Sequence, residues 1–216
     1  TGQYDVECSI TYRDASENGV FQNTYAATGW LPGAANLAVE KVFTGRPNDA
    51  WLETDEFSFT LAPDMSDEQT KAAVDAGQIV IGGDNPSSET VTIDDEDATK
   101  TASFSNITFS QPGNHTYKFI VSEVQPTGDG VTQNEQGQNV KGGITYDNSR
   151  KTVVVSVKDD GNGNLTAELG EGGDELVFTN MYATGSTTIT STDLGLNGTK
   201  ELTGRTWENG DSFTFL

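Results

Sequence analysis

The chain has 216 residues, of which 33 are acidic and 12 are basic, so its formal net charge at pH 7 is −21. Nucleic acid is not expected as a partner, because phosphate binding needs clustered Lys and Arg, and an anionic membrane surface is disfavoured for the same reason. With a single cysteine no disulfide can form within the chain, and no apolar run reaches the length of a membrane span, so we expect no membrane insertion.

Short alternating runs of apolar and polar residues predict an all-β protein with many turns. The segment 159–163 reads Asp-Asp-Gly-Asn-Gly and predicts a hairpin turn, because these residues tolerate positive φ. One helix is expected at about 67–76, with Ser66 and Gln69 as a capping box and Gly77 as the stop. Strands this short and frequent favour a β-sandwich. In chain order we expect strands near 36–44, 55–62, 78–82, 89–94, 101–109, 115–124, 151–158, 164–169 and 174–182.

Parts of the chain occur twice, which indicates a tandem repeat. The copies lie 157 residues apart from Asn23 to Asn180, and 159 residues apart from Lys41 to Lys200. The matching segments are Val20–Ala26 with Val177–Ala183, and Glu40–Arg46 with Thr199–Arg205.

The repeats predict three parts of the chain. Residues 1–28 would be the C-terminal tail of a preceding repeat, residues 30–184 one complete domain, and residues 185–216 the start of a following repeat. We therefore expect the chain to be a fragment of a longer array, in which adjacent repeats of the same chain are close neighbours.

Three polar residues lie on strand faces that are otherwise apolar. In the first strand of the complete unit, Lys41 shares a face with Val39 and Phe43, because side chains two apart point the same way. Asn180 interrupts an aromatic stripe in the last strand, and Glu123 completes an apolar set in the sixth. An unpaired buried charge costs several kcal/mol, so these three side chains are expected to satisfy one another.

Burial of Lys41, Glu123 and Asn180 together would allow a reaction between the amine and the carboxamide. Low dielectric favours the neutral amine of Lys41 and the protonated acid of Glu123. A neutral amine can attack the Asn180 carboxamide while the acid polarises the carbonyl and passes protons to the departing ammonia, and the product is a Lys–Asn isopeptide bond. A buried Lys41–Glu123 ion pair with Asn180 as hydrogen-bond partner explains the same pattern. In the neighbouring repeats the equivalent cross-link residues are Asn23 and Lys200.

Five strings in order make the chain resemble the streptococcal-type pilin isopeptide linkage domains, related to the backbone and T-antigen pilins of Gram-positive bacteria. The strings are Val39–Arg46, Gly113–Glu123, Gly143–Asp147, Val153–Leu165 and Val177–Tyr182. The resemblance implies an all-β, Ig-like (CnaB-like) β-sandwich repeat with one short helix, in tandem array. It also implies a cross-link between Lys41 and Asn180, with Glu123 as catalytic acid. The segment 124–142 is longer than the family pattern and is expected to add a surface loop.

The resulting hypothesis is a structural stalk or pilin-like repeat that cross-links itself once and is not a turnover enzyme. No cofactor and no metal are expected, and the location would be extracellular, on a cell wall or pilus. Other pilin subunits or host surface ligands are further expected partners. The alternative is an adhesive module that recognises a host protein or carbohydrate through its sandwich loops, notably residues 124–142.

Overall fold

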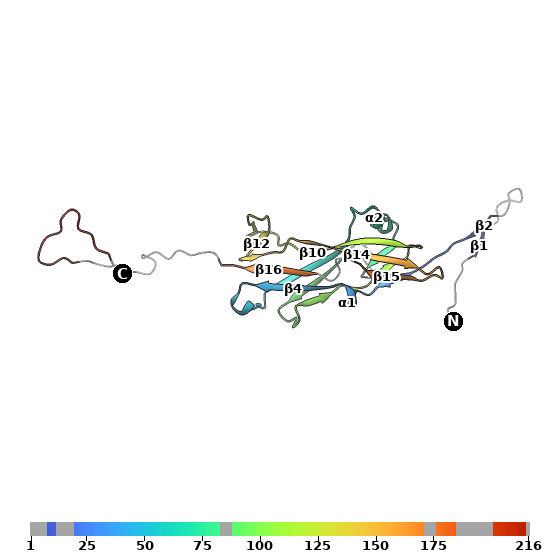
Figure 1. Cartoon of the computed structure of the whole chain (residues 1–216), viewed down its shortest axis with the longest axis horizontal. Coiled ribbons are helices and arrows are strands. Elements are labelled where there is room, and N and C mark those ends of the chain that lie inside the picture. Colours follow the sequence, from blue (N-terminus) through green and yellow to red (C-terminus); the bar gives the residue numbers. More distant parts are fainter. Residues whose placement is uncertain (1–7, 12–19, 83–87, 171–175, 185–200, 215–216) are drawn as a thin grey trace. The chain divides into compact units, whose positions relative to one another are not determined.

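Figure 1 shows the computed structural model, which describes residues 8–11, 20–82, 88–170, 176–184 and 201–214. Of residues 8–11 and 20–23 only the backbone is described. The chain divides into two units, Thr1–Ala183 and Thr184–Leu216.

Strands dominate the first unit, as expected from the sequence. Its elements are β1 (Cys8–Thr11), β2 (Val20–Asn23), β3 (Gly29–Leu31), α1 (Gly33–Asn36), β4 (Ala38–Thr44), η1 (Pro47–Asp49), β5 (Glu56–Pro63), α2 (Glu68–Asp75), β6 (Ile79–Ile81), β7 (Glu89–Asp94), β8 (Thr101–Ser103), β9 (Ile107–Phe109), β10 (His115–Glu123), β11 (Thr132–Gln133), β12 (Asn139–Lys141), β13 (Ile144–Thr145), β14 (Arg150–Asp159), β15 (Leu165–Leu169) and β16 (Val177–Tyr182).

The core lies between two main sheets of a β-sandwich. One sheet has the strand order β15-β14-β10-β5-β7, and the other has the order β11-β12-β13-β16-β4-β8. Phe59 of β5 and Phe178 of β16 are both fully buried, and their ring centroids lie 5.2 Å apart. The inner faces of the two sheets therefore meet directly. A smaller sheet, β3-β9-β6, extends this core, and β1 pairs with β2.

The first and last strands of the two main sheets, β4 and β16, lie side by side and run parallel. In the β4–β16 pair, Lys41 lies opposite Phe178, and Asn180 lies opposite Phe43. Parallel neighbours cannot be joined by a tight turn. Here the whole remainder of the sandwich separates them in sequence, so any covalent bond between these strands would enclose nearly the whole domain.

Two local expectations differ in detail from the structure. The run 101–109 is not one strand: β8 pairs with β4, whereas β9 pairs with β3 and β6, so the chain changes sheet between them. The helix α2 is capped by Asp67 and not by Ser66, because the Asp67 carboxylate accepts the backbone N–H of Thr70. Gly77 does follow the helix with a φ of +70°. The hairpin turn expected at 159–163 joins β14 to β15.

The segment 124–142 contains more order than the expected surface loop. β11 and β12 pair as an antiparallel hairpin, and β12 pairs in turn with β13, which pairs with β16. The insertion therefore extends the sheet that contains β4. Figure 1 shows this hairpin at the end of the domain where β16 ends.

The second unit repeats a side-chain arrangement of the first. In the first unit the Arg46 guanidinium binds both carboxylate oxygens of Asp55, and in the second Arg205 does the same with Asp211. Each Asp also accepts one backbone N–H from the chain between the pair.

An aromatic contact recurs beside each of these Arg–Asp pairs. Trp51 meets Phe57 edge to face at 5.3 Å between centroids, and Trp207 meets Phe213 at 5.2 Å. The two copies of the sequence thus fold alike at this turn, within each unit.

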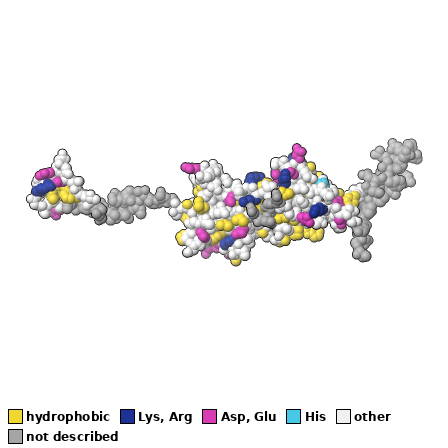
Figure 2. All heavy atoms as spheres, viewed as in Figure 1, with side chains coloured by type: hydrophobic (Ala, Val, Ile, Leu, Met, Phe, Trp, Pro, Cys, Tyr) yellow, Lys and Arg dark blue, Asp and Glu magenta, His cyan; other side chains and the backbone are white. Residues whose placement is uncertain are grey.

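In the view of Figure 2, acidic and basic side chains are interspersed over the described surface of the first unit and form no large patch of one charge. Among the described residues, no helix combines the length and apolarity needed to cross a membrane.

Candidate functional site

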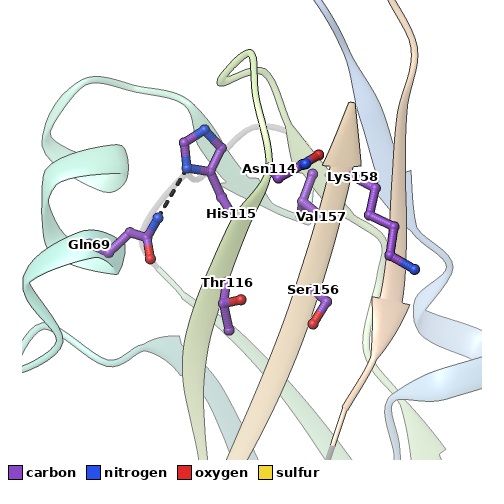
Figure 3. A pocket seen from close by; sticks show the side chains of 7 residues that line it. All are labelled: Gln69, Asn114, His115, Thr116, Ser156, Val157 and Lys158. Carbon is purple, nitrogen blue, oxygen red and sulfur yellow. Dashed lines mark hydrogen bonds between the residues drawn. The ribbon is translucent and has the colours of Figure 1, made fainter. Parts of the chain in front are cut away.

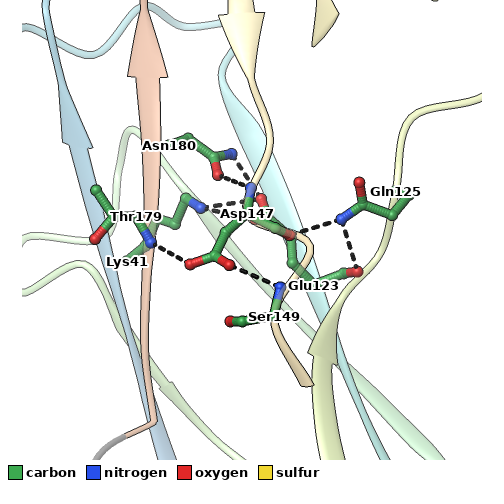
Figure 4. A network of polar contacts seen from close by, with 7 residues as sticks. All are labelled: Lys41, Glu123, Gln125, Asp147, Ser149, Thr179 and Asn180. Carbon is green, nitrogen blue, oxygen red and sulfur yellow. Dashed lines mark hydrogen bonds and ion pairs between the residues drawn. The ribbon is translucent and has the colours of Figure 1, made fainter. Parts of the chain in front are cut away.

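Three strands bring Lys41, Glu123 and Asn180 together inside the sandwich (Figure 4). Lys41 and Asn180 point inward from the neighbouring strands β4 and β16, and Glu123 is the last residue of β10 in the facing sheet. The exposed fractions of the three residues are 3%, 4% and 0% in the order Lys41, Glu123, Asn180. All three residues expected from the alternation therefore face the core.

The Glu123 carboxyl lies between the other two side chains. The Lys41 Nζ lies 3.0 Å from both Glu123 oxygens, and the Asn180 amide nitrogen donates to Glu123 Oε1 at 2.7 Å. The expectation that these three groups satisfy one another is met by direct hydrogen bonds. One carboxyl thus touches both the amine and the carboxamide.

Aromatic rings keep the amine out of water. The Lys41 Nζ lies 4.7 Å from the ring centroid of Phe57 and 5.6 Å from that of Phe59. Burial lowers the pKa of Lys41 from 10.5 to about 8, and the attraction of Glu123 restores only part of the loss. Burial likewise raises the pKa of Glu123, although Lys41 and Asn180 oppose this. The environment thus moves both groups towards their neutral forms.

The other side of the Asn180 amide is held by Asp147, in the connection between β13 and β14. The Asp147 backbone N–H donates to the Asn180 Oδ1 at 2.8 Å. The Asp147 carboxylate accepts the backbone N–H groups of Thr179 and Ser149, at 2.9 Å and 2.8 Å. Asp147 is thereby fastened to β16 beside the residue that it contacts.

Burial raises the pKa of Asp147, but the hydrogen bonds from Thr179 and Ser149 outweigh it and hold this pKa below its ordinary value. Asp147 therefore stays a carboxylate beside the site, and its negative charge raises the pKa of both Lys41 and Glu123. Sequence reasoning included Asp147 in a family-like string but assigned it no role, because a residue in a connection has no strand alternation to reveal its direction.

The orientation of the carboxamide differs from the arrangement expected from the sequence. Glu123 contacts the nitrogen of the Asn180 amide, whereas the carbonyl oxygen accepts its hydrogen bond from the Asp147 N–H. The acid is thus placed next to the atom that would leave, and a separate donor is placed at the oxygen.

The side chains of Asn23 and Lys200, the equivalent residues of the neighbouring repeats, are not among those that the structure describes. Asn23 ends β2, where only the backbone is described, opposite Cys8. Lys200 lies outside the described residues.

A hollow of about 430 Å³ lies apart from this site, beside α2, β10 and β14 (Figure 3). Within it, Gln69 Nε2 lies 3.0 Å from His115 Nδ1. Its lining includes no Trp, Tyr or Phe on which a sugar ring could stack, so it does not favour the adhesive alternative. Among the described residues no group of three or more His, Cys, Asp or Glu side chains could hold a metal ion.

A β-sandwich that buries a lysine and an asparagine against one carboxyl group has the features of an isopeptide-containing domain. The chain matches the model of the family FctA, described as the Spy0128-like isopeptide containing domain, over residues 37–183. This match spans more than half of the chain, so the chain belongs to that family.

Three solved pilin structures are similar to this chain. The major pilin T-13 from Streptococcus pyogenes is 21% identical with a TM-score of 0.37, over 74% of this chain and 54% of that chain. The major pilin T3.2 from the same species is 21% identical with a TM-score of 0.38, over 72% and 55%. A mutant of a Streptococcus pyogenes major pilin is 14% identical with a TM-score of 0.37, over 74% and 51%. The chain thus spans about half the length of these pilins, and no curated protein sequence matches it.

Proposed function

We propose that this chain is part of the stalk of a Gram-positive surface pilus or wall-attached protein, and that its complete domain closes a Lys41–Asn180 isopeptide bond by itself. The observation that carries the proposal is the position of Glu123, whose carboxyl group contacts both the attacking amine and the leaving nitrogen in a dry core. Membership of an isopeptide-containing family supports it.

The reaction balances with the groups at hand. The Lys41 ammonium gives a proton to Glu123, and the neutral Nζ attacks the Asn180 Cγ. The bond from Cγ to the amide nitrogen then breaks, while Glu123 passes one proton from the attacking nitrogen to the departing one. Ammonia leaves, the new amide joins Lys41 to Asn180, and the proton taken from the ammonium stays on Glu123 or leaves with the ammonia. One bond forms per molecule, so no turnover follows.

Negative charge develops on the Asn180 Oδ1 during the attack. The Asp147 N–H already donates to that atom at 2.8 Å. A donor held in place beforehand costs no reorganisation when the charge appears, and loss of one such donor in enzymes slows reaction by about 10²–10³. We assign this stabilising role to the Asp147 backbone, positioned by its own side chain.

The bond would change how the domain carries tension. It encloses the chain from residue 41 to residue 180, about 140 residues, and the loop-entropy model for cross-links gives about 5 kcal/mol of stabilisation for a loop of that size. Tension that reaches Lys41 would pass directly to Asn180, through adjacent parallel strands. The enclosed residues then carry little force, which suits a stiff extracellular stalk built from adjacent repeats.

Intact mass of the purified full chain tests the proposal. The parent is expected to be lighter than its sequence mass by one ammonia, and peptide mapping should find Lys41 joined to Asn180. The Glu123→Ala and Asn180→Ala variants should keep their full sequence masses. A parent at full sequence mass would reduce the three residues to a buried polar cluster and remove the isopeptide proposal.

A further inference from the structure

Tyr25 makes a contact that the isopeptide site does not use. Its hydroxyl donates to Asp159 Oδ1 at 2.7 Å and accepts the backbone N–H of Gly163 at 2.9 Å. Both partners belong to the hairpin turn between β14 and β15, more than 130 residues away in sequence. Although the ring is 46% exposed, the hydroxyl is thus held from two sides.

The Asp159 side chain is held in position for this contact by backbone hydrogen bonds. Its Oδ2 accepts the backbone N–H of Gly113 at 2.7 Å, and its Oδ1 accepts that of Gly161 at 2.8 Å. The hydrogen bond from Tyr25, followed by those from the two glycines, holds the pKa of Asp159 below its ordinary value. The turn therefore presents an ionised, well-oriented acceptor to the tyrosine.

The backbone after Tyr25 continues along the same hairpin. Thr28 forms a parallel bridge with Asn164, in which its N–H donates to the Gly163 oxygen at 3.2 Å and its oxygen accepts the Leu165 N–H at 2.8 Å. Ala27 is buried at 2% exposure. Gly29 passes so close that a Cβ there would lie 2.0 Å from the Leu165 oxygen. The segment then enters β3, which pairs with β9.

This segment lies between two proposed cross-links in the sequence. Tyr25 follows Asn23 by two residues, as Tyr182 follows Asn180, and residues 24–40 precede Lys41. Residues 24–40 are therefore outside both covalent loops and can be pulled straight by tension. In the complete domain the Tyr182 ring lies over the Arg46 guanidinium, 4.9 Å from the ring centroid, and its hydroxyl makes no hydrogen bond to a described residue.

We propose that the turn Asp159–Gly163 is a docking site for the tail of the preceding repeat, engaged through the tyrosine two residues after that repeat's cross-linking asparagine. The partner is thus a segment of the same chain that contains the sequence Asn-x-Tyr-Ala, residues 23–26. The inference rests on the proposed stalk function, since it treats residues 1–28 as the tail of a repeat. The contact holds the stretch between the two cross-links against the domain. The cross-links themselves do not protect this stretch from being extended by tension.

Hydrogen exchange of the full chain tests the docking of Tyr25 on the turn Asp159–Gly163, whether or not the isopeptide bond forms. In Tyr25→Phe the two hydrogen bonds of the hydroxyl are lost, so the docked segment opens more often, and we expect roughly tenfold faster exchange of the Thr28 and Leu165 amides. Amides of the β10–β14 pair should be unchanged. Tyr182→Phe, which removes the equivalent hydroxyl of the complete domain, is the matched control and should leave residues 24–31 unaffected. Equal exchange of Thr28 and Leu165 in Tyr25→Phe and wild type overturns the proposal.

Stretching single molecules by their ends tests the docking contact and the cross-link independently. With the bond formed, release of the stretch 24–40 adds about 17 residues or ~60 Å when extended, and Tyr25→Phe should lower the force of that step. A ~60 Å step at the same force in both proteins overturns the docking proposal while the cross-link stands. A step that also releases residues 41–180 overturns the isopeptide proposal. The docking proposal is then tested by the hydrogen-exchange measurement alone.

Discussion

The carboxyl group of Glu123 accepts the amide N–H of Asn180 at 2.7 Å, and with the same oxygen it lies 3.0 Å from the Lys41 amine. A carboxyl group in this position can take a proton from one nitrogen and give one to the other without moving. On the other side of the carboxamide the Asp147 N–H contacts the oxygen. Proton transfer and charge stabilisation are thereby assigned to different residues, and this division can be tested.

Glu123→Gln is expected to prevent bond formation. Glutamine can keep hydrogen bonds to both neighbours but cannot accept and return a proton, so the variant should keep its full sequence mass. It also leaves the buried Lys41 without its counter-charge, a change that typically costs 3–5 kcal/mol. Urea unfolding should show this loss on top of the loss of the cross-link. A Glu123→Gln protein lighter by one ammonia would contradict the assigned role of the acid.

Asp147→Ala is expected to slow the bond without abolishing it. The backbone N–H remains, but the carboxylate's hydrogen bonds with Thr179 of β16 and with Ser149 are gone, so we expect a rate at least about tenfold lower, up to the 10²–10³ typical of a lost oxyanion donor. The fraction lighter by one ammonia, followed over time in newly translated protein, measures the rate.

A purely electrostatic role for Asp147 predicts the opposite result. Its charge raises the pKa of Lys41, so removing the charge would leave more free amine and speed the reaction. Faster bond formation in Asp147→Ala would therefore contradict positioning as its main role.

The stability of the uncross-linked Asn180→Ala variant should rise with pH between about 8 and 10.5. Burial lowers the folded-state pKa of Lys41 to about 8 from 10.5, so over this range the unfolded chain binds more protons than the folded one. The free energy of unfolding then increases with pH, by up to about 3 kcal/mol at ~1.4 kcal/mol per pKa unit. Urea unfolding across this range provides the measurement.

Two comparisons isolate the contribution of Lys41 to that pH dependence. The double variant Lys41→Met/Asn180→Ala should lack the rise, because it has no amine at this position. Cross-linked wild type should lack it too, since an amide nitrogen does not titrate. An identical rise in all three proteins would mean that other groups cause it.

Arg46→Lys is expected to destabilise the first unit by about 1–3 kcal/mol. Lysine cannot make the paired hydrogen bonds to Asp55, and it cannot replace the contacts of the guanidinium with the rings of Phe43 and Tyr182, whose centroids lie 4.7 Å and 4.9 Å away. Arg205→Lys is the matched control, because Arg205 binds Asp211 within the second unit. Equal thermal unfolding of the first unit in both variants would rule out this contribution.

The sequence by itself determined the sandwich class and which side chains face the core. Alternation is a local property with period two, so it revealed β4 to β7, β10 and β14 to β16, and it showed Lys41, Glu123 and Asn180 on buried faces. The positive-φ residues of the Asp159–Gly163 turn likewise identified a hairpin. These signals depend only on neighbours along the chain.

Tertiary structure alone decided which strands are neighbours and how the carboxamide is oriented. No periodicity encodes the parallel β4–β16 pair, or the division of 101–109 between two sheets. Asp147 and Tyr25 act from connections, where side-chain direction has no repeating pattern, and their partners Asn180 and Asp159 are distant in sequence. Pairing and register are fixed by packing of the whole core, because a single strand face can be buried against more than one partner.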